Sequence, residues 1–304
     1  MEISNIDISK EGVLVPATVT PVRYPGGKTK LYSFVQELLK ANDLLSGTYC
    51  EPFAGGAGLA LKLLVKKDVG RIIINDADPA IYSVWDMILN NTDEICDFIK
   101  TVQLTVAEWE RQRSIYNAHS GEPGKELAKA TFFLNRTNIS GVITGGMIGG
   151  KRQQGKFKID ARFNRENLIS KIHNIAELAN KIELYNYDVL DFMDIIIPRL
   201  HRKALVNFDP PYVKKGGLLY RNSFTEADHK VLHDRIATCQ AKWIVTYDVC
   251  DFIKELYRDF SGDYIDVYYS AKITRKAKEF IFYSDDLVVP KKRFAKERVI
   301  ISQC

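Results

Sequence analysis

The segment Ala204-Leu-Val-Asn-Phe-Asp-Pro-Pro-Tyr212 is the most informative part of this 304-residue chain. Its apolar first half predicts a buried strand of a parallel sheet. Two prolines then hold the exit of the strand in an extended conformation, because the proline ring fixes φ and restricts the residue before it. Asp209 offers a carboxylate and Pro210 a carbonyl, so two acceptors can meet one amino group. The ring of Tyr212 provides a surface on which a planar substrate can stack.

A glycine-rich turn, Glu51-Pro-Phe-Ala-Gly-Gly-Ala-Gly58, lies upstream between an expected strand at 48–53 and an expected helix at 59–65. The apolar run 71–75 predicts another buried strand and ends at Asp76. Glycines at such a turn let the backbone approach a ligand, and an acid after the next strand commonly binds ribose hydroxyls. The order predicts a βαβ unit that binds NAD, FAD or S-adenosylmethionine, and the missing G-x-G-x-x-G spacing weighs against NAD.

Similar patterns predict the other elements: strands at 182–185, 242–246, 264–268 and 280–283, and helices at 31–39, 81–89, 107–116, 126–134 and 225–239. Thr225 with Asp228 predicts a capping box at the start of the last helix. Residues 1–20 carry few signals and are expected to form an arm or an edge strand.

The organisation changes between about residues 90 and 181, where helical segments surround a glycine-rich stretch at 141–150. We therefore predict an α/β fold with a central, mostly parallel sheet flanked by helices. Residues 1–89 plus 182–304 form this catalytic domain, and residues 90–181 form an inserted, mainly helical domain.

Positive charge is concentrated in the segment 151–165, which holds six basic residues and one acid. Six minus one gives +5, which equals the net charge of the whole chain, so the rest of the protein is balanced. Phe157 and Phe163 are interleaved with these charges. The segment suits a nucleic-acid backbone with aromatic rings available to stack, and a solvated loop is the alternative interpretation.

Composition excludes several classes of protein. Hydrophobic residues are 46% and charged residues 27%, as in an ordinary globular protein. No apolar run approaches the roughly 18 residues of a membrane span, and the N-terminus lacks the apolar core of a signal peptide. The five scattered cysteines suggest free thiols in a reducing cytoplasm. His229 and His233 are one helical turn apart without a third ligand nearby, so we expect surface or capping roles and no metal.

The motifs taken together resemble the Dam-type class of DNA adenine methyltransferases, in which Asp209–Tyr212 corresponds to the DPPY motif. The other matching segments are Arg23–Lys28 for (W/Y)xGGK, Glu51–Gly58 for EPFxG, Asn75-Asp76 for the ribose-binding acid, Phe132–Arg136 for FLNR, and Asn222–Phe224 with Asp228-His229 for the entrance of the next helix. The resemblance runs from about residue 22 to about residue 285. Two positions depart from it, because Tyr24 replaces a frequent tryptophan and Ala57 replaces a glycine.

This resemblance implies a Rossmann-like fold and a site-specific DNA methyltransferase. The enzyme would transfer a methyl group from S-adenosylmethionine to the N6 amine of adenine in double-stranded DNA, with base flipping, and would release S-adenosylhomocysteine. No metal is implied. The implied catalytic residues are Asp209, Pro210, Pro211 and Tyr212. The implied cofactor contacts are Tyr24, Lys28, Phe53, Ala54, Gly55, Gly56, Asp76, Asp188 and Asp209.

The inserted domain is expected to grip DNA. The predicted contacts are Asn135, Arg136, Asn138, Lys151, Arg152, Lys156 and Lys158. For Asp188 the residues themselves leave a second interpretation open, the N-cap of a helix at 189–197.

We expect a cytoplasmic, nucleoid-associated protein of a prokaryote or a phage-infected cell, with no membrane partner. A cognate restriction endonuclease that acts on the same DNA site is a candidate partner. Two alternatives stay open, an RNA adenine or guanine methyltransferase and a non-catalytic DNA-binding protein on a methyltransferase scaffold. Methylation of duplex DNA rather than RNA, and binding of S-adenosylmethionine, separate these possibilities.

Overall fold

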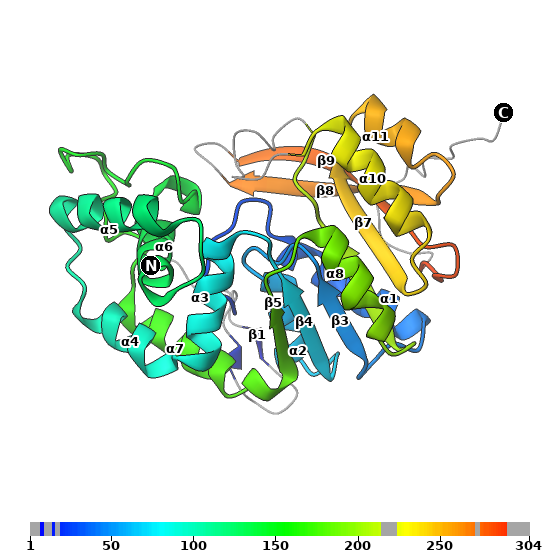
Figure 1. The fold of residues 1–304 in the computed structure, drawn as a ribbon, viewed down its shortest axis with the longest axis horizontal. Coiled ribbons are helices and arrows are strands. Elements are labelled where there is room, and N and C mark those ends of the chain that lie inside the picture. The colour runs from blue at the N-terminus through cyan, green and yellow to red at the C-terminus, as the bar shows by residue number, and fades with distance from the viewer. Residues whose placement is uncertain (1–6, 9–13, 16–18, 214–223, 271–273, 291–304) are drawn as a thin grey trace.

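The computed structural model describes residues 7–8, 14–15, 19–213, 224–270 and 274–290. Its centre is a seven-stranded sheet with the order β5-β4-β3-β6-β7-β9-β8 (Figure 1). The strands are β3 (Thr48–Glu51), β4 (Arg71–Asn75), β5 (Ile182–Tyr185), β6 (Ala204–Phe208), β7 (Lys242–Asp248), β8 (Gly262–Ser270) and β9 (Thr274–Tyr283). The first five in the sheet order run parallel, and β9 and β8 form an antiparallel hairpin beside β7. The predicted mostly parallel sheet is confirmed.

Helices cover both faces of this sheet, so its strands are buried on both sides. In β3, Tyr49 packs into one buried cluster and Cys50 into a second one. The first cluster includes α1 (Tyr32–Ala41), α2 (Gly58–Val65) and α3 (Pro79–Asn90), and the second includes α8 (Val189–Ile195), α10 (Glu226–Ala237) and α11 (Asp251–Leu256). Such runs of apolar residues are typical of parallel strands between two helical layers. The capping box predicted for Thr225 and Asp228 is present at the start of α10.

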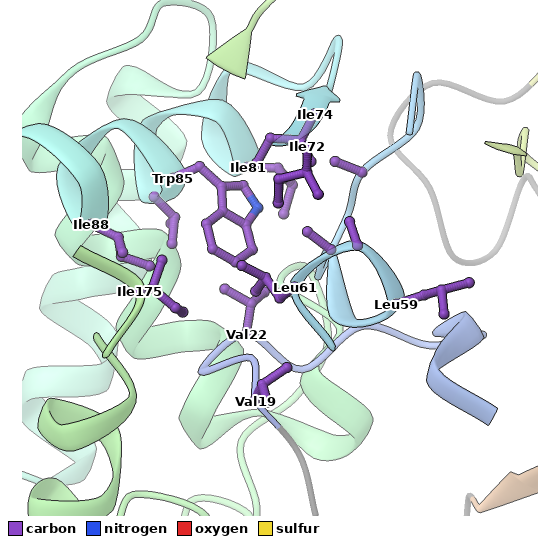
Figure 2. Close-up of a cluster of buried hydrophobic side chains, with 14 of the residues drawn as sticks. Val19, Val22, Leu59, Leu61, Ile72, Ile74, Ile81, Trp85, Ile88 and Ile175 are labelled. Atoms are coloured by element: carbon purple, nitrogen blue, oxygen red, sulfur yellow. The ribbon is translucent and has the colours of Figure 1, made fainter. Parts of the chain in front are cut away.

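The inserted segment is mainly helical, as predicted, and lies beyond α3 in Figure 1. Its helices are α4 (Thr92–Thr101), α5 (Val106–His119), α6 (Lys125–Thr137) and α7 (Arg165–Ala176). Figure 2 shows Ile72 and Ile74 of the sheet, Trp85 of α3 and Ile175 of α7 in one buried cluster. Because this core is continuous across the expected domain boundary, the division at residues 90 and 181 stays a prediction.

The remaining short elements are the 3-10 helices Lys28–Leu31, Ile139–Gly141, Ala179–Lys181 and Ile197–Arg199 and the strands β1 (Asp7–Ile8) and β2 (Leu14–Val15). β1 and β2 pair with each other and not with the main sheet, so the described part of residues 1–20 contains no edge strand of that sheet. Among the described residues, no helix is both long and apolar enough to cross a membrane.

The topology places a crevice beside β3. The chain passes from β3 outward to β4 and β5, then returns to β6 on the other side of β3. In open α/β sheets, ligands bind outside the carboxyl ends of the strands at such a reversal of strand order. Glu51 ends β3 and Asp209 follows β6, so the two sequence motifs meet at this point.

Candidate active site

A cavity of about 980 Å³ opens at this crevice. It is lined by most of the residues predicted to contact the cofactor, namely Tyr24, Lys28, Phe53, Ala54, Gly56, Asp76, Asp188 and Asp209. Of the remaining predicted catalytic residues, Pro211 lines the cavity, whereas Pro210 and Tyr212 do not. Gly55 is also absent from the lining.

The glycine-rich turn depends on a close approach by Tyr24. Gly55 has a φ of +45°, and a Cβ atom there would come within 2.7 Å of the Tyr24 ring. Any larger residue would therefore be strained and would collide with this ring. The N–H of Gly55 donates to Asp76 Oδ2 at 2.8 Å, and Trp85 Nε1 donates to the Gly55 carbonyl at 2.9 Å. Gly55 thus supports the turn from behind Tyr24, and its predicted cofactor contact stays a prediction.

Ala57, which replaces a glycine of the motif that Glu51–Gly58 resembles, has an unusual backbone conformation. Its φ is 44° and its ψ is 30°, which is the left-handed conformation that glycine adopts without strain. An alanine here costs about 1 kcal/mol relative to a glycine. The turn therefore has a backbone conformation that suits glycine at a position occupied by alanine.

Asn75 and Asp76 organise the carboxyl ends of three strands. Buried Asn75 donates to the carbonyls of Pro52 and Tyr187 and accepts from the Tyr187 N–H at 2.9 Å. Asp76 accepts from the N–H groups of Gly55 and Asp78. Burial, followed by the charge of Asp78, raises the pKa of Asp76 to about 7. Two donors satisfy about half of the lone pairs of a carboxylate, so Asp76 can still accept from hydroxyl groups.

Asp188 caps a helix, as the second interpretation predicted. Its Oδ1 atom accepts a hydrogen bond from the Leu190 N–H at 2.9 Å at the start of α8. Asp188 also lines the cavity, so its role toward the cofactor stays a prediction.

A buried ammonium joins the two motifs. Lys28 Nζ lies 2.9 Å from Asp209 Oδ1, 2.8 Å from the Tyr212 hydroxyl and 3.1 Å from the Gly26 carbonyl. It also lies 3.6 Å from Glu279 Oε2 and 5.1 Å from the centre of the Tyr212 ring. Burial lowers the pKa of Lys28, but the two carboxylates raise it further, and the net shift is upward. Lys28 is therefore a fixed positive charge at the floor of the site.

The Asp209 carboxylate is anchored through one of its own two oxygens. Its Oδ1 atom receives Thr246 Oγ1 at 2.8 Å and the ammonium of Lys28. No hydrogen bond from a described residue reaches Oδ2, and the side chain keeps 23% exposure at the cavity. The arrangement fixes the carboxylate while leaving one acceptor for a ligand.

Glu51 brings a second carboxyl group close to Asp209. It is buried at the end of β3 and lines the same cavity. Burial, followed by the charge of Asp209, raises the pKa of Glu51 to about 8. At neutral pH this carboxyl is mostly protonated and can act as a donor.

Asn135 does not have the position expected of a DNA contact. Its Oδ1 atom accepts from the Arg23 N–H at 2.8 Å, and its Nδ2 atom donates to the carbonyls of Arg23 at 2.6 Å and Gly141 at 3.0 Å. The residue is buried and all three bonds are internal. We therefore reassign Asn135 to the joint between α6 and the segment that precedes Tyr24.

Asn138 is likewise an internal residue. Its Nδ2 atom donates to the carbonyls of Val142 and Ile143, and its Oδ1 atom accepts from Trp109 Nε1 at 2.7 Å. Buried and fully bonded, it shapes the loop after α6 and cannot reach DNA in this structure.

The predicted basic segment is divided between surface and core. Lys151, Arg152, Lys156 and Lys158 are exposed, and Lys151 forms an ion pair with Glu110 at 2.8 Å. Phe157 is 59% exposed, whereas Phe163 is 4% exposed and packs against Phe132 and Phe133. Phe163 is therefore a core residue and not a ring available for stacking, which corrects the sequence prediction.

The surface role expected for His229 is wrong. His229 is fully buried, its Nδ1 atom lies 3.0 Å from the Tyr247 hydroxyl, and burial lowers its pKa. Its ring lies 5.4 Å from that of Phe224, which lines the cavity. Within the described ranges, no group of three or more His, Cys, Asp or Glu side chains could hold a metal ion. Asn222 and Ser223 lie outside the described residues.

The role of Asn135 can be tested through stability. We expect Asn135→Ala to lower the free energy of unfolding by about 2–4 kcal/mol, because it leaves buried backbone groups of Arg23 and Gly141 unpaired. Urea unfolding followed by circular dichroism measures this. Asn174→Ala, at an exposed position of α7, is the control and should change stability by less than about 0.5 kcal/mol. Equal stability of the two variants would contradict the assignment.

Glu51 predicts a pH-dependent stability. Its folded pKa of about 8 exceeds the unfolded value of 4.5, so the folded protein favours the protonated carboxyl and loses stability as pH rises between these values. Glutamine cannot ionise, so Glu51→Gln should be more stable than the wild type at pH 9, by on the order of 1–4 kcal/mol, and similar at pH 5. Unfolding at both pH values checks this, with exposed Glu177→Gln as control. If the free energy of unfolding of Glu51→Gln differed from that of the wild type by the same amount at pH 5 and pH 9, the effect would be excluded.

Comparison with known proteins places these features in a family. The model of the D12 class N6 adenine-specific DNA methyltransferases matches residues 24–271. The type II methyltransferase M.MjaIII of Methanocaldococcus jannaschii is 24% identical over 221 residues, which cover 68% of this chain and 73% of the relative. The type II methyltransferase M.CviBI of Paramecium bursaria Chlorella virus NC1A is 25% identical over 245 residues, which cover 78% and 85%.

Among solved structures, a precorrin-6y C5,15-methyltransferase from Geobacter metallireducens is similar with a TM-score of 0.36 and 10% identity, over 88% of this chain and 97% of that chain. The family match spans more than half of the sequence and favours a DNA methyltransferase over the RNA-modifying and non-catalytic alternatives. Methyl transfer of this kind implies S-adenosylmethionine as donor and DNA as substrate. The chain belongs to the D12 class N6 adenine-specific DNA methyltransferases.

Proposed function

We propose that Asp209 and the carbonyl of Pro210 receive the N6 amine of an adenine that has flipped out of double-stranded DNA. The observation that carries this proposal is the state of the Asp209 carboxylate. One of its oxygens is anchored by Lys28 and Thr246, while the other is available at a cavity that also reaches the glycine-rich turn. Fixed acceptors aimed at a reacting amine contribute to catalysis without reorganisation.

The residues around the cavity fit S-adenosylmethionine. Tyr24 and Phe53 offer ring surfaces, Asp76 has unused lone pairs for hydroxyl groups, and Gly56 keeps the turn open beside Tyr24. A cavity of about 980 Å³ is at the upper end of the usual range for small-molecule sites, so it can hold a cofactor and a nucleobase together. When bound, this cofactor supplies a methyl group attached to a positively charged sulfur.

The chemistry requires activation of a weak nucleophile. The lone pair of the adenine amine is delocalised into the ring, and acceptors that bind its two hydrogens outside the ring plane favour a tetrahedral nitrogen. Asp209 Oδ2 and the Pro210 carbonyl can accept these two hydrogens, since each oxygen has lone pairs available as acceptors. Holding the amine in line with the methyl group provides the rest of the rate enhancement.

The stacking surface for the flipped base is a separate question. Tyr212 is buried between Lys28 and Tyr247, and its ring does not line the cavity. Phe53 and Phe224 do line it, with ring centres 6.1 Å apart. These two rings are therefore candidates to contact the base, and stacking on Tyr212 stays a prediction.

We infer that DNA follows positive charge from the exposed basic segment to the insert end of the cavity. Arg23, Arg136 and Lys171 line that end. The guanidinium of Arg23 donates to the Asn138 carbonyl, and that of Arg136 donates to the carbonyls of Arg162 and Pro21, so both positive charges are held in place by neutral acceptors. Burial and neighbouring arginines lower the pKa of Arg136 to about 9, and burial and Arg136 lower the pKa of Lys171 to about 8. A phosphate would relieve this repulsion, so the cluster suits the backbone beside a flipped nucleotide.

A restriction endonuclease is the proposed partner of the enzyme. Both curated relatives carry the description type II methyltransferase. A restriction endonuclease of the same DNA specificity, in the cytoplasm of the same cell, would account for such an enzyme.

The role of Asp209 is tested by Asp209→Ala. We expect loss of N6-methyladenine formation in duplex DNA by at least about 100-fold, because the acceptor that orients the amine is missing. Transfer of a labelled methyl group measures this, with circular dichroism as the check of folding. Asp259→Asn, a change at an exposed acid, is the control and should keep full activity. Turnover by folded Asp209→Ala would refute the proposed role.

The basic segment is tested by the triple variant Lys151→Ala, Arg152→Ala and Lys156→Ala. We expect weaker DNA binding with a shallower salt dependence, in which each lost phosphate contact lowers the slope by about 0.9. Fluorescence anisotropy at several salt concentrations measures this slope. A triple alanine variant at the exposed positions Lys40, Lys181 and Lys254 controls for net charge. Equal slopes for the two variants would remove the segment from the interface.

A further inference from the structure

Phe157 exposes an aromatic ring in the middle of the basic segment. The side chain is 59% exposed, and its two neighbours in sequence, Lys156 and Lys158, are exposed cations. A single exposed apolar residue is common on protein surfaces and carries no function by itself. What distinguishes Phe157 is the way in which the surrounding chain holds the ring.

The loop that carries Phe157 is fixed by internal contacts. Gln153 Oε1 accepts a hydrogen bond from the Ile159 N–H at 2.8 Å, and Gln153 Nε2 donates to the Ile148 carbonyl at 2.9 Å. A Cβ atom on Gly149 would come within 2.8 Å of the Phe157 carbonyl oxygen, so the backbone at the ring packs closely on this glycine. Ile159 is buried and anchors the chain two residues after Phe157. The loop therefore presents the ring at a defined position.

The same loop continues from the wall of the cavity. Residues 140–144 line the cavity. Beyond them, Met147 pairs with Asn138, and the Ile148 N–H donates to the Thr137 carbonyl at 2.8 Å, which joins the loop to the end of α6. The ring therefore belongs to a part of the insert that borders the cavity, on the path proposed above for DNA.

A duplex offers few surfaces that suit an apolar ring. The ammonium groups of Lys156 and Lys158 suit phosphates, which carry no sequence information and no apolar surface. The base edges in the major groove include one apolar group, the C5-methyl group of thymine, and phenylalanine is among the side chains that contact it. The major groove also presents the N6 amine of adenine, the group that this family methylates.

The position of Lys156 favours a contact in the groove over insertion of the ring between base pairs. Its Nζ atom lies over one face of the Phe157 ring, 5.7 Å from the ring centre. A wedge between two base pairs needs both faces of the ring, because each face stacks on a base. A contact with a methyl group needs only one face or an edge.

We propose that Phe157 contacts the C5-methyl group of a thymine in the major groove of the recognition site, and that it thereby contributes to the choice of DNA sequence. This inference rests on the binding of DNA by the basic segment that is proposed above. Each target adenine is paired with a thymine, so a site of this enzyme presents at least one such methyl group. The flanking lysines contribute affinity without regard to sequence, whereas the ring contributes discrimination.

The test compares DNA that contains thymine with DNA that contains uracil, which lacks only the C5-methyl group. One duplex of mixed sequence is amplified with dTTP or with dUTP, and kcat/KM for methyl transfer is measured on both products. For the wild type we expect kcat/KM to be about 3–10-fold lower on uracil DNA, because one buried methyl group contributes a factor of this order. Phe157→Ala should lose the preference and give a ratio of about 1.

Val288→Ala is the matched control. It removes an equally exposed apolar side chain beside Asn42 at the end of α1, far from the insert (Figure 1), and it should keep the wild-type ratio. A wild type that does not distinguish the two DNAs, or a Phe157→Ala variant that keeps the wild-type ratio, would overturn the proposal. Equal loss of activity on both DNAs in this variant is the second of these results and would indicate insertion or a sugar contact.

The proposals on which this inference depends fail in other measurements. If the basic segment does not bind DNA, the two triple alanine variants have equal salt slopes. If Asp209 does not orient the amine, Asp209→Ala retains activity, and the ratio between thymine and uracil DNA is unaffected.

Discussion

The buried ammonium of Lys28 is the constraint on which the site depends. A charge taken out of water is tolerated only when it is paired, and the partners of Lys28 come from distant parts of the chain. Asp209 and Tyr212 follow the central strand β6, and Glu279 belongs to β9 in the antiparallel hairpin. The Asp209 carboxylate therefore meets its buried cation only when the N-terminal motif that carries Lys28 has assembled against the sheet.

The architecture could be predicted from sequence where local signals agree. The strands 71–75, 182–185 and 204–208 are short apolar runs bounded by turns, and the structure has them at these residues. β9 begins at Thr274, well before the predicted run 280–283. The prediction missed the first half of this strand because that half is polar. Pairing with β7 and β8, rather than periodicity, extends this strand.

The site was predicted less evenly than the fold. Asp76 and Asp209 could be placed at one cavity because each follows a recognisable strand, and Lys28 could be placed there through the resemblance of Arg23–Lys28 to a family motif. The burial of Asn135 and Phe163 depends on tertiary contacts that a loop-like sequence does not reveal. Thr246 and Glu279 were not predicted, although the single acid at the start of an apolar run was a usable signal for the latter residue.

The bond between Asn135 and the backbone of Arg23 has a mechanical consequence. Asn135 belongs to the inserted helices, and the residue after Arg23 is Tyr24, whose ring rests on Gly55. The N–H and the carbonyl of Arg23, which belong to two successive peptide units, thus link α6 to the glycine-rich turn through Tyr24. A displacement of α6 relative to Tyr24 would break the hydrogen bonds between Asn135 and Arg23 or move the Tyr24 ring away from Gly55. The position of α6 and the contact of the Tyr24 ring with the glycine-rich turn are therefore coupled through the backbone of Arg23.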